Sequence, residues 1–371
     1  MSLERLEEDL ASERFPAGAV QTLAPTRGAH SLHAATTLNE SVTHDTTVAF
    51  KFGGSSLLGA SRMLHAAHLV QTAARTSRVV VVVSAMKGVT DRLLALANLL
   101  ADHHLSAARR EAEALVDLHL DVLSDLHLDE PQDLLVRRGL QLLGRDLLHE
   151  VPRDARVTAS AELFDRLASF GERFSARLFS AALEKLGVAS VPVASSDFIR
   201  TCEKFRDAQP DLPETRQRGR QILLPLLEDG LVPVVTGFIG ASPDGRITTL
   251  GRNSSDFSGA LIAHVVNARE LVIWTDVDGI FTANPHESPE ARLLHELSYD
   301  EAHALAASGA KVLHAKVLPL AAETQMVVWV RNSFNPQSSG TRIGSPRAAE
   351  RSAPENAATA FSVDVQQGGA A

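Results

Sequence analysis

The sequence predicts an α/β protein built on a parallel sheet. Two apolar runs, residues 47–50 and 79–83, enclose a glycine pair and a stretch of helical periodicity that ends near Arg75. The order strand, glycine turn, helix, buried strand is typical of a βαβ unit, whose two strands run parallel. With 371 residues, 44% of them hydrophobic, the chain is long enough to bury a sizeable core.

The rest of the central region alternates in the same way. Between residues 93 and 148, leucines recur at steps of three and four among charged residues, which predicts helices interrupted near Pro131. Further helices are expected from about residue 163 and over residues 211–229, 257–267 and 298–308, and further strands over residues 189–193, 231–235, 271–274 and 325–330. Such alternation predicts a sheet covered by helices.

The two ends of the chain differ in composition from its middle. Residues 1–46 mix a short charged helical pattern with Ala, Thr, Ser and His, and we expect a flexible extension there. Residues 344–371 are rich in Gly, Ser, Pro, Ala and Glu, which predicts a disordered tail. The folded domain would therefore comprise residues 47–343.

Composition narrows the class of function. The formal net charge of −9 argues against sequence-independent binding to nucleic acid or to an anionic membrane, because both need a surplus of Lys and Arg. No apolar run approaches the ~20 residues of a membrane-spanning helix, and residues 1–15 are acidic, unlike a signal peptide. The single cysteine, Cys202, excludes an internal disulfide. We expect a cytoplasmic protein that acts on a small molecule.

Lys51-Phe-Gly-Gly-Ser-Ser56 is a candidate anion-binding turn between a strand and a helix. Glycine lets backbone amides approach an anion closely, the helix N-terminus adds partial positive charge, and Lys51 supplies a cation. The segment lacks the Gly-Lys-Ser or Gly-Lys-Thr ending of a P-loop. Taken alone, it fits an ordinary tight turn with a surface lysine equally well.

Gly251-Arg-Asn-Ser-Ser-Asp256 repeats this arrangement at the start of a later helix. Ser254 and Ser255 can donate hydrogen bonds, Asp256 can cap the helix, and Arg252 offers a planar fork suited to a carboxylate or phosphate. The alternative is a capped helix with one exposed arginine. Two such anion sites in one α/β chain favour a nucleotide ligand.

Four further charged positions are ambiguous by themselves. Asp276 and Asp278 follow a buried strand, where open α/β sheets place ligands, and their carboxylates could hold a ribose or orient Mg²⁺ or simply stabilise a turn. Glu172 and Lys311 fit solvated positions as well as a site. The adjacent His103 and His104 lack the spacing of a metal site, so exposed helix positions are favoured.

Together these segments resemble the catalytic domain of the aspartokinases. The resemblance runs from about residue 48 to residue 343 and includes Val83-Ser-Ala-Met-Lys-Gly-Val-Thr90, Ser169-Phe-Gly-Glu172, Thr236-Gly-Phe-Ile-Gly240, Ile273-Trp-Thr-Asp-Val-Asp-Gly279, the stretch from Gly309 to His314, and Asn332-Ser-Phe-Asn-Pro336. It implies the amino acid kinase fold, a three-layer α/β/α sandwich with a mainly parallel central sheet. It also implies phosphorylation of the side-chain carboxylate of L-aspartate by ATP, with Mg²⁺ as cofactor.

The resemblance implies three groups of site residues. The catalytic group would be Lys51, Asp256 and Lys311. The amino acid would be bound by Ser84, Thr90, Glu172, Arg252 and Ser255. ATP and its phosphates would be bound by Gly53, Gly54, Ser55, Gly251, Ser254, Thr275, Asp276 and Asp278, with magnesium held through ATP instead of directly by the protein. Residues 47–240 would form the amino-acid-binding lobe and residues 241–343 the ATP-binding lobe, in a chain that could form a homodimer.

The sequence departs from the family pattern at several places. Asn253-Ser254 stands where the family usually has two glycines or Asn-Gly, Asn284-Pro285-His286 where it has Asp-Pro-Arg, and Ala315-Lys316 where it has Pro-Arg. The 28 residues after Ile343 are too few for the ACT domains of the family, so feedback inhibition through such domains is not expected. Three hypotheses stay open: an unregulated aspartate kinase, a kinase of this fold for another amino acid or related carboxylate, and a non-catalytic nucleotide-binding partner subunit.

Overall fold

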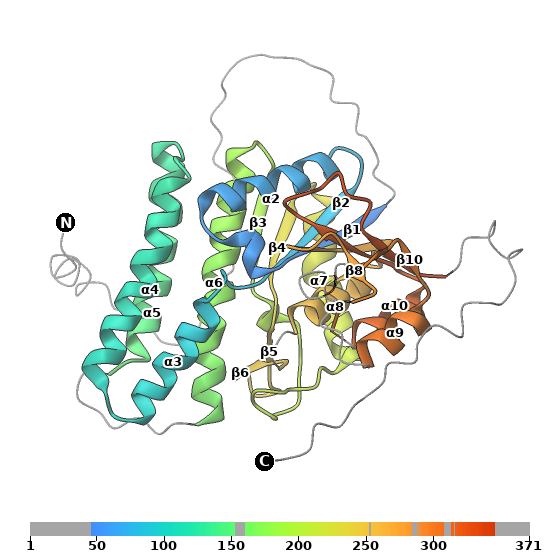
Figure 1. Ribbon diagram of the computed structural model, residues 1–371. Helices are drawn as coiled ribbons and strands as arrows, with labels where there is room; N and C mark the ends of the chain where they lie inside the picture. Colours follow the sequence, from blue (N-terminus) through green and yellow to red (C-terminus); the bar gives the residue numbers. More distant parts are fainter. Residues whose placement is uncertain are drawn as a thin grey trace, which may run out of the picture. The chain divides into compact units, whose positions relative to one another are not determined.

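A mainly parallel sheet forms the centre of the computed structural model (Figure 1). The structure describes residues 46–152, 160–251, 254–283, 288, 290–307, 313–314 and 316–345, which all fall in one compact unit of the chain. The strands of the large sheet are β1 (Thr47–Phe52), β2 (Arg78–Val83), β3 (Ser190–Val193), β4 (Val232–Thr236), β7 (Glu270–Thr275), β10 (Glu296–Leu297), β11 (Val327–Asn332) and β12 (Thr341–Ile343). Their order is β10-β12-β11-β7-β1-β2-β4-β3, and in the described residues every neighbouring pair is parallel except β11 with β12.

Helices cover both faces of this sheet. They are α2 (Ala60–Ala73), α3 (Val89–Ala101), α4 (Leu105–Asp125), α5 (Glu130–His149), α6 (Ala161–Lys185), α7 (Leu212–Glu228), α8 (Ser255–Val265), α9 (Tyr299–Ala307) and α10 (Val317–Thr324), with short 3-10 helices η1 (Gly54–Leu57) and η2 (Ser195–Asp197). Side chains alternate between the faces along β2. Val79, Val81 and Val83 pack into a core with α2 to α6, whereas Val80 and Val82 pack into a second core with α7, α8 and α10. This arrangement confirms the three-layer α/β/α prediction.

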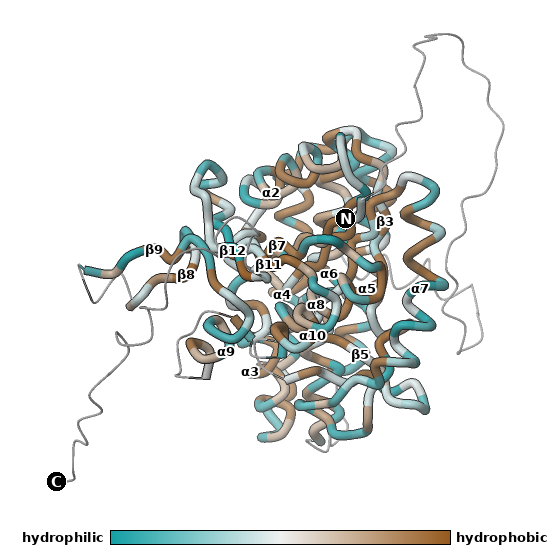
Figure 2. The backbone as a smooth tube through the Cα atoms, turned by 90° about the vertical axis from the view of Figure 1, so that its right-hand side faces the viewer, coloured by the Kyte–Doolittle hydropathy of each residue, from teal (hydrophilic) through white to brown (hydrophobic). Residues whose placement is uncertain are grey.

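The inner strands are buried on both sides, as their continuous apolar sequences predict. All five valines of β2 are at most 1% exposed. Figure 2 shows the same distribution as hydrophobic segments in the central strands and polar segments at the periphery. The two predicted lobes, residues 47–240 and 241–343, both contribute strands to this sheet, since β1 pairs with β7. Their separate roles in binding the amino acid and ATP stay a prediction.

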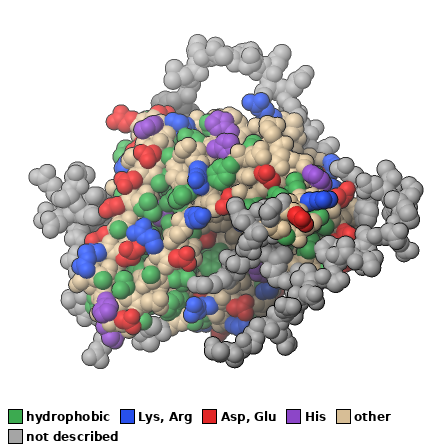
Figure 3. Space-filling model, in the orientation of Figure 1, with side chains coloured by type: hydrophobic (Ala, Val, Ile, Leu, Met, Phe, Trp, Pro, Cys, Tyr) green, Lys and Arg blue, Asp and Glu red, His purple; other side chains and the backbone are tan. Residues whose placement is uncertain are grey.

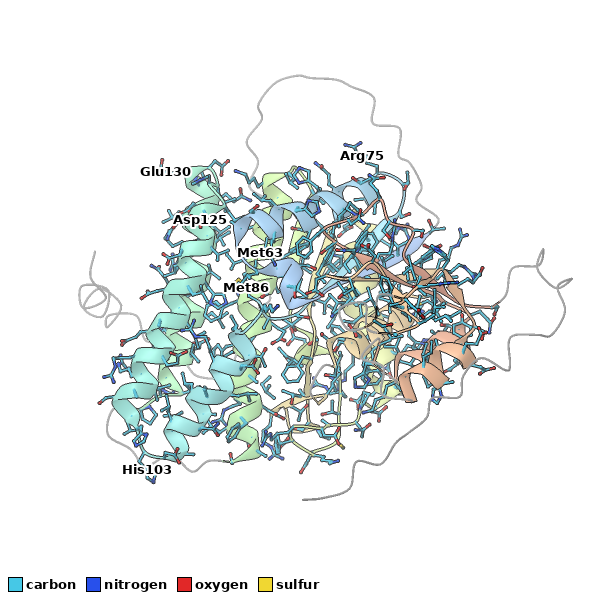
Figure 4. All side chains as sticks on the ribbon, viewed as in Figure 1. Met63, Arg75, Met86, His103, Asp125 and Glu130 are labelled. Carbon is cyan, nitrogen blue, oxygen red and sulfur yellow. The ribbon has the colours of Figure 1, made fainter. Side chains whose placement is uncertain are left out.

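The helical region between residues 93 and 148 is confirmed, but it is interrupted twice. The first break, residues 102–104, places His103 and His104 in an exposed turn and not in a helix as predicted. The second break precedes Pro131. Helix α4 ends at Asp125 and α5 begins at Glu130 (Figure 4). The Asp129 side chain accepts a hydrogen bond from the Gln132 backbone and so caps α5. Pro131 therefore lies in the first turn of α5, where its missing N–H breaks no helical hydrogen bond.

Helices α4 and α5 lie side by side and pack on α6, away from the sheet (Figure 1). On this side of the molecule, Figure 3 shows acidic, basic and hydrophobic side chains interspersed. The predicted N-terminal extension (residues 1–46) and C-terminal tail (residues 344–371) lie outside the described residues, except for residues 46, 344 and 345. Two pairs of very short strands, β5 (Ile239–Ala241) with β6 (Ile247–Thr249) and β8 (Ile280–Phe281) with β9 (Leu293–Leu294), were not predicted.

Candidate active site

The carboxyl ends of four parallel strands bring the predicted site segments to one edge of the sheet. The anion turn follows β1, Ser84 follows β2, Gly237 follows β4, and Asp276 follows β7. These strands are neighbours in the order β7-β1-β2-β4, so segments separated by more than two hundred residues in the chain become adjacent. Open α/β sheets place ligands at such an edge.

Lys51 and Asp256 form an ion pair at this edge. The Lys51 side chain points from β1 toward α8, and its Nζ lies 2.7 Å from Asp256 Oδ1. Only 9% of the Lys51 side chain and 19% of the Asp256 side chain are exposed. Asp256 is not the helix cap, because the cap position of α8 is Ser254, so the carboxylate is available to position the ammonium of Lys51.

The glycine pair allows a close approach of two loops. Gly53 N donates a hydrogen bond to Trp274 O over 3.1 Å, which joins the turn to the end of β7. A Cβ added at Gly54 would lie 2.7 Å from Ala85 O, so any side chain there would displace the loop after β2. Beside these loops, Met63 of α2 and Met86 (Figure 4) are buried in the core of the helical side.

The loop after β2, which begins at Ser84, is bonded to Ser255 and Glu172. Ser84 Oγ donates to Ser255 Oγ over 3.0 Å, although the two residues are 171 positions apart. Ala85 N donates to Glu172 Oε1 over 3.1 Å. Thr90 is half-buried in the first turn of α3, on the connection that begins at Ser84.

Glu172 is a buried carboxyl group in the middle of α6, with 3% of the residue exposed. Burial raises its pKa to about 8, against the opposing effects of the Ala85 N–H and the charge of Lys51. Its second oxygen, Oε2, has no hydrogen-bond partner among the described residues. A buried carboxyl group with an unused oxygen can accept a hydrogen bond from an ammonium group, which would also stabilise its ionised form.

The second anion turn is described only at its two ends. Gly251 has φ 97°, a conformation that favours glycine. Ser254 has φ −82°, so a serine fits this backbone without strain, and its buried Oγ has no hydrogen-bond partner in the described part of the chain. Arg252 and Lys311, together with Asn253, Asn284-Pro285-His286 and Ala315, lie outside the described residues, and their roles stay predictions.

The turn after β7 holds the predicted nucleotide residues. Thr275 Oγ1 donates to Asp276 Oδ1 over 3.3 Å, and Asp276 is otherwise exposed. Asp278 is half-buried and accepts hydrogen bonds from the side chains of Asn332 and Asn335. The described residues contain no cluster of three or more His, Cys, Asp or Glu side chains that could hold a metal ion.

Asp165 is a buried residue of the site that the sequence analysis missed. It lies seven residues before Glu172 on the same side of α6. Its carboxyl group accepts from Arg206 N at 2.8 Å, from Thr249 N at 2.9 Å and from Thr249 Oγ1 at 2.7 Å. Burial raises its pKa, although these hydrogen bonds act in the opposite direction. Asp165 therefore anchors Thr249, two residues before Gly251, and only the seven-residue spacing from Glu172 could have revealed it.

Phe238 is a second residue without an assigned role. Its φ of 66° is rare for a non-glycine residue, and such strain is concentrated at functional sites. The Phe238 N–H donates to Ser258 Oγ of α8 over 2.8 Å, which holds this conformation. The preceding Gly237 lies against Ser255. Phe238 therefore lies beside the predicted amino-acid residues, and its place in the Thr236–Gly240 motif was the available signal.

Known proteins are similar to this chain over most of its length. The profile of the amino acid kinase family matches residues 46–332. The lysine-sensitive aspartokinase 3 of Escherichia coli is 33% identical over 296 residues, which are 80% of this chain and 64% of that protein. Aspartokinase 1, chloroplastic, of Arabidopsis thaliana is 33% identical over 315 residues, or 82% of this chain and 53% of that protein.

Solved structures agree with these matches. The crystal structure of E. coli aspartokinase III in complex with aspartate and ADP has a TM-score of 0.73 at 33% identity, covering 80% of this chain and 64% of that one. Clostridium acetobutylicum aspartate kinase shares the fold with a TM-score of 0.63 at 20% identity, over 81% of this chain and 62% of that one. The chain thus spans about half to two thirds of the length of these relatives. No described helix is long and apolar enough to cross a membrane.

Proposed function

Because the chain belongs to the amino acid kinase family, we propose that it transfers the γ-phosphoryl group of ATP to the side-chain carboxylate of L-aspartate. The product would be 4-phospho-L-aspartate, an acyl phosphate. The proposal is supported by the aspartokinase relatives and by the E. coli structure that contains aspartate and ADP. The observation that carries it is the placement of the Lys51–Asp256 ion pair near the buried carboxyl group of Glu172.

That placement suits an amino acid and a phosphoryl group at once. Glu172 would accept the ammonium of aspartate through its unused oxygen, Oε2. Ser84 and Ser255 would contact the substrate from the opposite loops, and Arg252 would bind its α-carboxylate. Lys51, held by Asp256, would face the phosphoryl group between the two substrates.

The reaction needs no covalent enzyme intermediate and no general base. The aspartate side chain, with a pKa near 4, is already an anion at neutral pH. One of its oxygens forms a bond to the γ-phosphorus as the bond from that phosphorus to the β–γ bridging oxygen breaks, and ADP leaves. The protein contributes by aligning the two substrates and by neutralising charge, chiefly through Lys51.

ATP would lie along the ends of β1 and β7, over Gly53, Gly54 and Asp276. Mg²⁺ would supply charge neutralisation on the phosphates, and it usually binds through one or two carboxylates together with phosphate oxygens. The exposed carboxylate of Asp276 would orient a Mg²⁺ ion that is held through ATP. Lys311 would complete the nucleotide site, and the one cysteine in 371 residues favours a cytoplasmic setting.

Aspartate-dependent release of ADP tests this function. The purified protein is incubated with MgATP and each member of a panel of amino acids and related carboxylates, and ADP is measured. L-Aspartate should stimulate ADP release most strongly. A stronger response to another compound would assign the same chemistry to a different substrate, and ATP binding without any stimulated release would leave a non-catalytic nucleotide-binding protein.

A further inference from the structure

Residues 332–335, which are the last residue of β11 and the loop that follows it, have no role in the proposed reaction. They belong to one of the motifs shared with the aspartokinases. Strand β11 pairs in parallel with β7, so this loop lies beside the turn of Thr275 and Asp276. Its side chains contact two different loops of the candidate active site.

Ser333 joins the anion turn of residues 51–56, which is the phosphate turn of the proposed site, to the end of β7. The residue is 1% exposed, and its Oγ lies 2.8 Å from Ser56 Oγ and 3.2 Å from Thr275 O. A hydroxyl group has one hydrogen to donate, so Ser333 donates to the Thr275 carbonyl and accepts from Ser56. Ser333 N also donates to Thr275 O, over 2.9 Å. One side chain therefore adds a second link between the two loops, beside the hydrogen bond from Gly53 N to Trp274 O.

The two asparagines of the loop bind the same carboxylate. Asn332 Nδ2 donates to Asp278 Oδ1 over 2.7 Å, and Asn335 Nδ2 donates to the same oxygen over 3.2 Å. The Phe334 N–H donates to Asn332 Oδ1 over 2.9 Å, which fixes the orientation of that amide. These bonds hold the turn after β7 at a second point.

Helix α2 also contacts both the loop after β11 and the phosphate turn. His65 Nε2 donates to the Ser333 carbonyl over 2.6 Å. Three residues earlier on the same helix face, Arg62 donates to Ser55 O over 2.9 Å, and its guanidinium lies 4.8 Å from the centre of the Phe334 ring. The loop is thus bonded to the phosphate turn, to the turn after β7 and to α2.

We propose that residues 332–335 are a positioning element that holds the phosphate turn and the turn after β7 in the spacing required by ATP, with Ser333 as the residue that joins them. The inference rests on the proposed function, in which these two turns bind the nucleotide. None of the four side chains needs to touch the substrate. The loop acts through Ser56, Thr275 and Asp278.

Ser333→Ala tests the role by comparing the two substrates. The variant should raise KM for ATP roughly five- to tenfold, as expected for the loss of one buried hydrogen bond, and should leave KM for aspartate within about twofold. Ser190→Ala is the matched control, because Ser190 Oγ also lies 2.8 Å from a buried serine hydroxyl, that of Ser180, and donates to the Ser180 carbonyl. Equal changes in both KM values, or the same ATP effect in Ser190→Ala, would overturn the proposal.

Asn332→Asp provides a second variant of nearly unchanged size. It replaces a donor to Asp278 with an acceptor, so two carboxylates would face each other across a contact of 2.7 Å. ATP affinity should fall at least as much as in Ser333→Ala, and affinity for aspartate should be retained. Unchanged ATP affinity in a folded Asn332→Asp protein would contradict the positioning role.

Hydrogen exchange of the free protein separates this inference from the proposed function, since it needs no substrate. Ser333→Ala should accelerate amide exchange in residues 53–57 and in residues 275–278, and Ser190→Ala should accelerate it in neither. Unchanged exchange in both turns overturns the inference, whatever the enzyme phosphorylates. If the wild-type protein releases no ADP with any amino acid, the proposed function fails, and the exchange result still decides the role of the loop.

Discussion

At the scale of single residues, burial determines what the charged groups of the site can do. Lys51 and Glu172 are both less than 10% exposed, yet Lys51 has a carboxylate partner, whereas within the described residues Glu172 accepts a hydrogen bond from one backbone N–H. The first is held as a fixed cation, and the second has its pKa raised. At one edge of the sheet, Lys51 could therefore face a phosphate while Glu172 binds the ammonium group of an amino acid.

Replacing Lys51 should impair catalysis far more than folding. Lys51→Ala should lower kcat by about 10²–10³, because a cation that faces charge developing in the transition state is lost. Lys185→Ala removes an exposed lysine that donates to His127 O over 2.7 Å at the end of α6, and it should leave kcat unchanged. Thermal unfolding of both variants provides the comparison, and a loss of folded Lys51→Ala protein in proportion to the activity would identify a structural lysine.

Glu172 predicts a pH dependence of stability in the free protein. The folded protein keeps the Glu172 proton up to its pKa of about 8, whereas the unfolded chain loses that proton near 4.5. Between these values the unfolded chain binds fewer protons, so Glu172 makes the free energy of unfolding fall as pH rises, by at most about 1.4 kcal/mol per pH unit.

Urea unfolding between pH 5 and 8 checks this contribution. Glu172→Gln cannot ionise and should show a shallower decline of stability with pH than the wild type. Glu228→Gln, at an exposed glutamate at the end of α7, should decline like the wild type. Identical slopes in wild type and Glu172→Gln would mean that Glu172 is ionised in the folded protein.

The sequence identifies Lys51, Gly54 and Asp256 as site residues because they belong to contiguous motifs whose chemistry is recognisable. Asp165 and the role of Ser333 escape such reasoning. An aspartate in an amphipathic helix has no distinctive local pattern, and the motif that contains Ser333 does not reveal what its hydroxyl contacts. Their partners, Thr249 and Ser56, are distant in the sequence. Only the folded chain shows that these polar groups are buried and paired.

At the scale of elements, α6 connects two loops of the proposed amino-acid site. This 25-residue helix presents Glu172 to the loop after β2 and Asp165 to the end of β6. Because the two acidic residues lie two turns apart on one rigid helix, the distance between these loops is set by α6. The sequence predicts such a helix from its leucine and phenylalanine spacing, whereas strands of two or three residues, such as β5 and β6, are too short to show a period.

Asp165→Ala should therefore affect aspartate more than ATP. Alanine has no acceptor, so the Arg206 N–H, the Thr249 N–H and the Thr249 hydroxyl would all lose their partner. KM for aspartate should rise roughly tenfold, and KM for ATP should rise less, because the chain that leads to Arg252, the proposed partner of the aspartate α-carboxylate, would no longer be held by α6. Asp117→Ala, at an exposed position of α4, is the control. An equal rise of both KM values would indicate a general loss of structure.

At the scale of the whole molecule, the parallel sheet brings the segments of the candidate site together. Parallel neighbours place the ends of β7, β1, β2 and β4 at the same edge, which is why the predicted residues meet although they are spread from Lys51 to Asp278. Continuous apolar strands alternating with helices predict the parallel sheet and its helical layers. They do not predict the strand order or the antiparallel β12, since these depend on connections between distant segments.

The central claim is the transfer of a phosphoryl group to the side-chain carboxylate of aspartate, and trapping the product with hydroxylamine tests it most directly. An acyl phosphate reacts with hydroxylamine to give a stable hydroxamate, whereas simple hydrolysis of ATP gives none. Incubation with MgATP, L-aspartate and hydroxylamine should yield aspartyl hydroxamate in an amount that matches the ADP released. ADP released without hydroxamate, or bound ATP with no turnover in the presence of aspartate, would contradict the account.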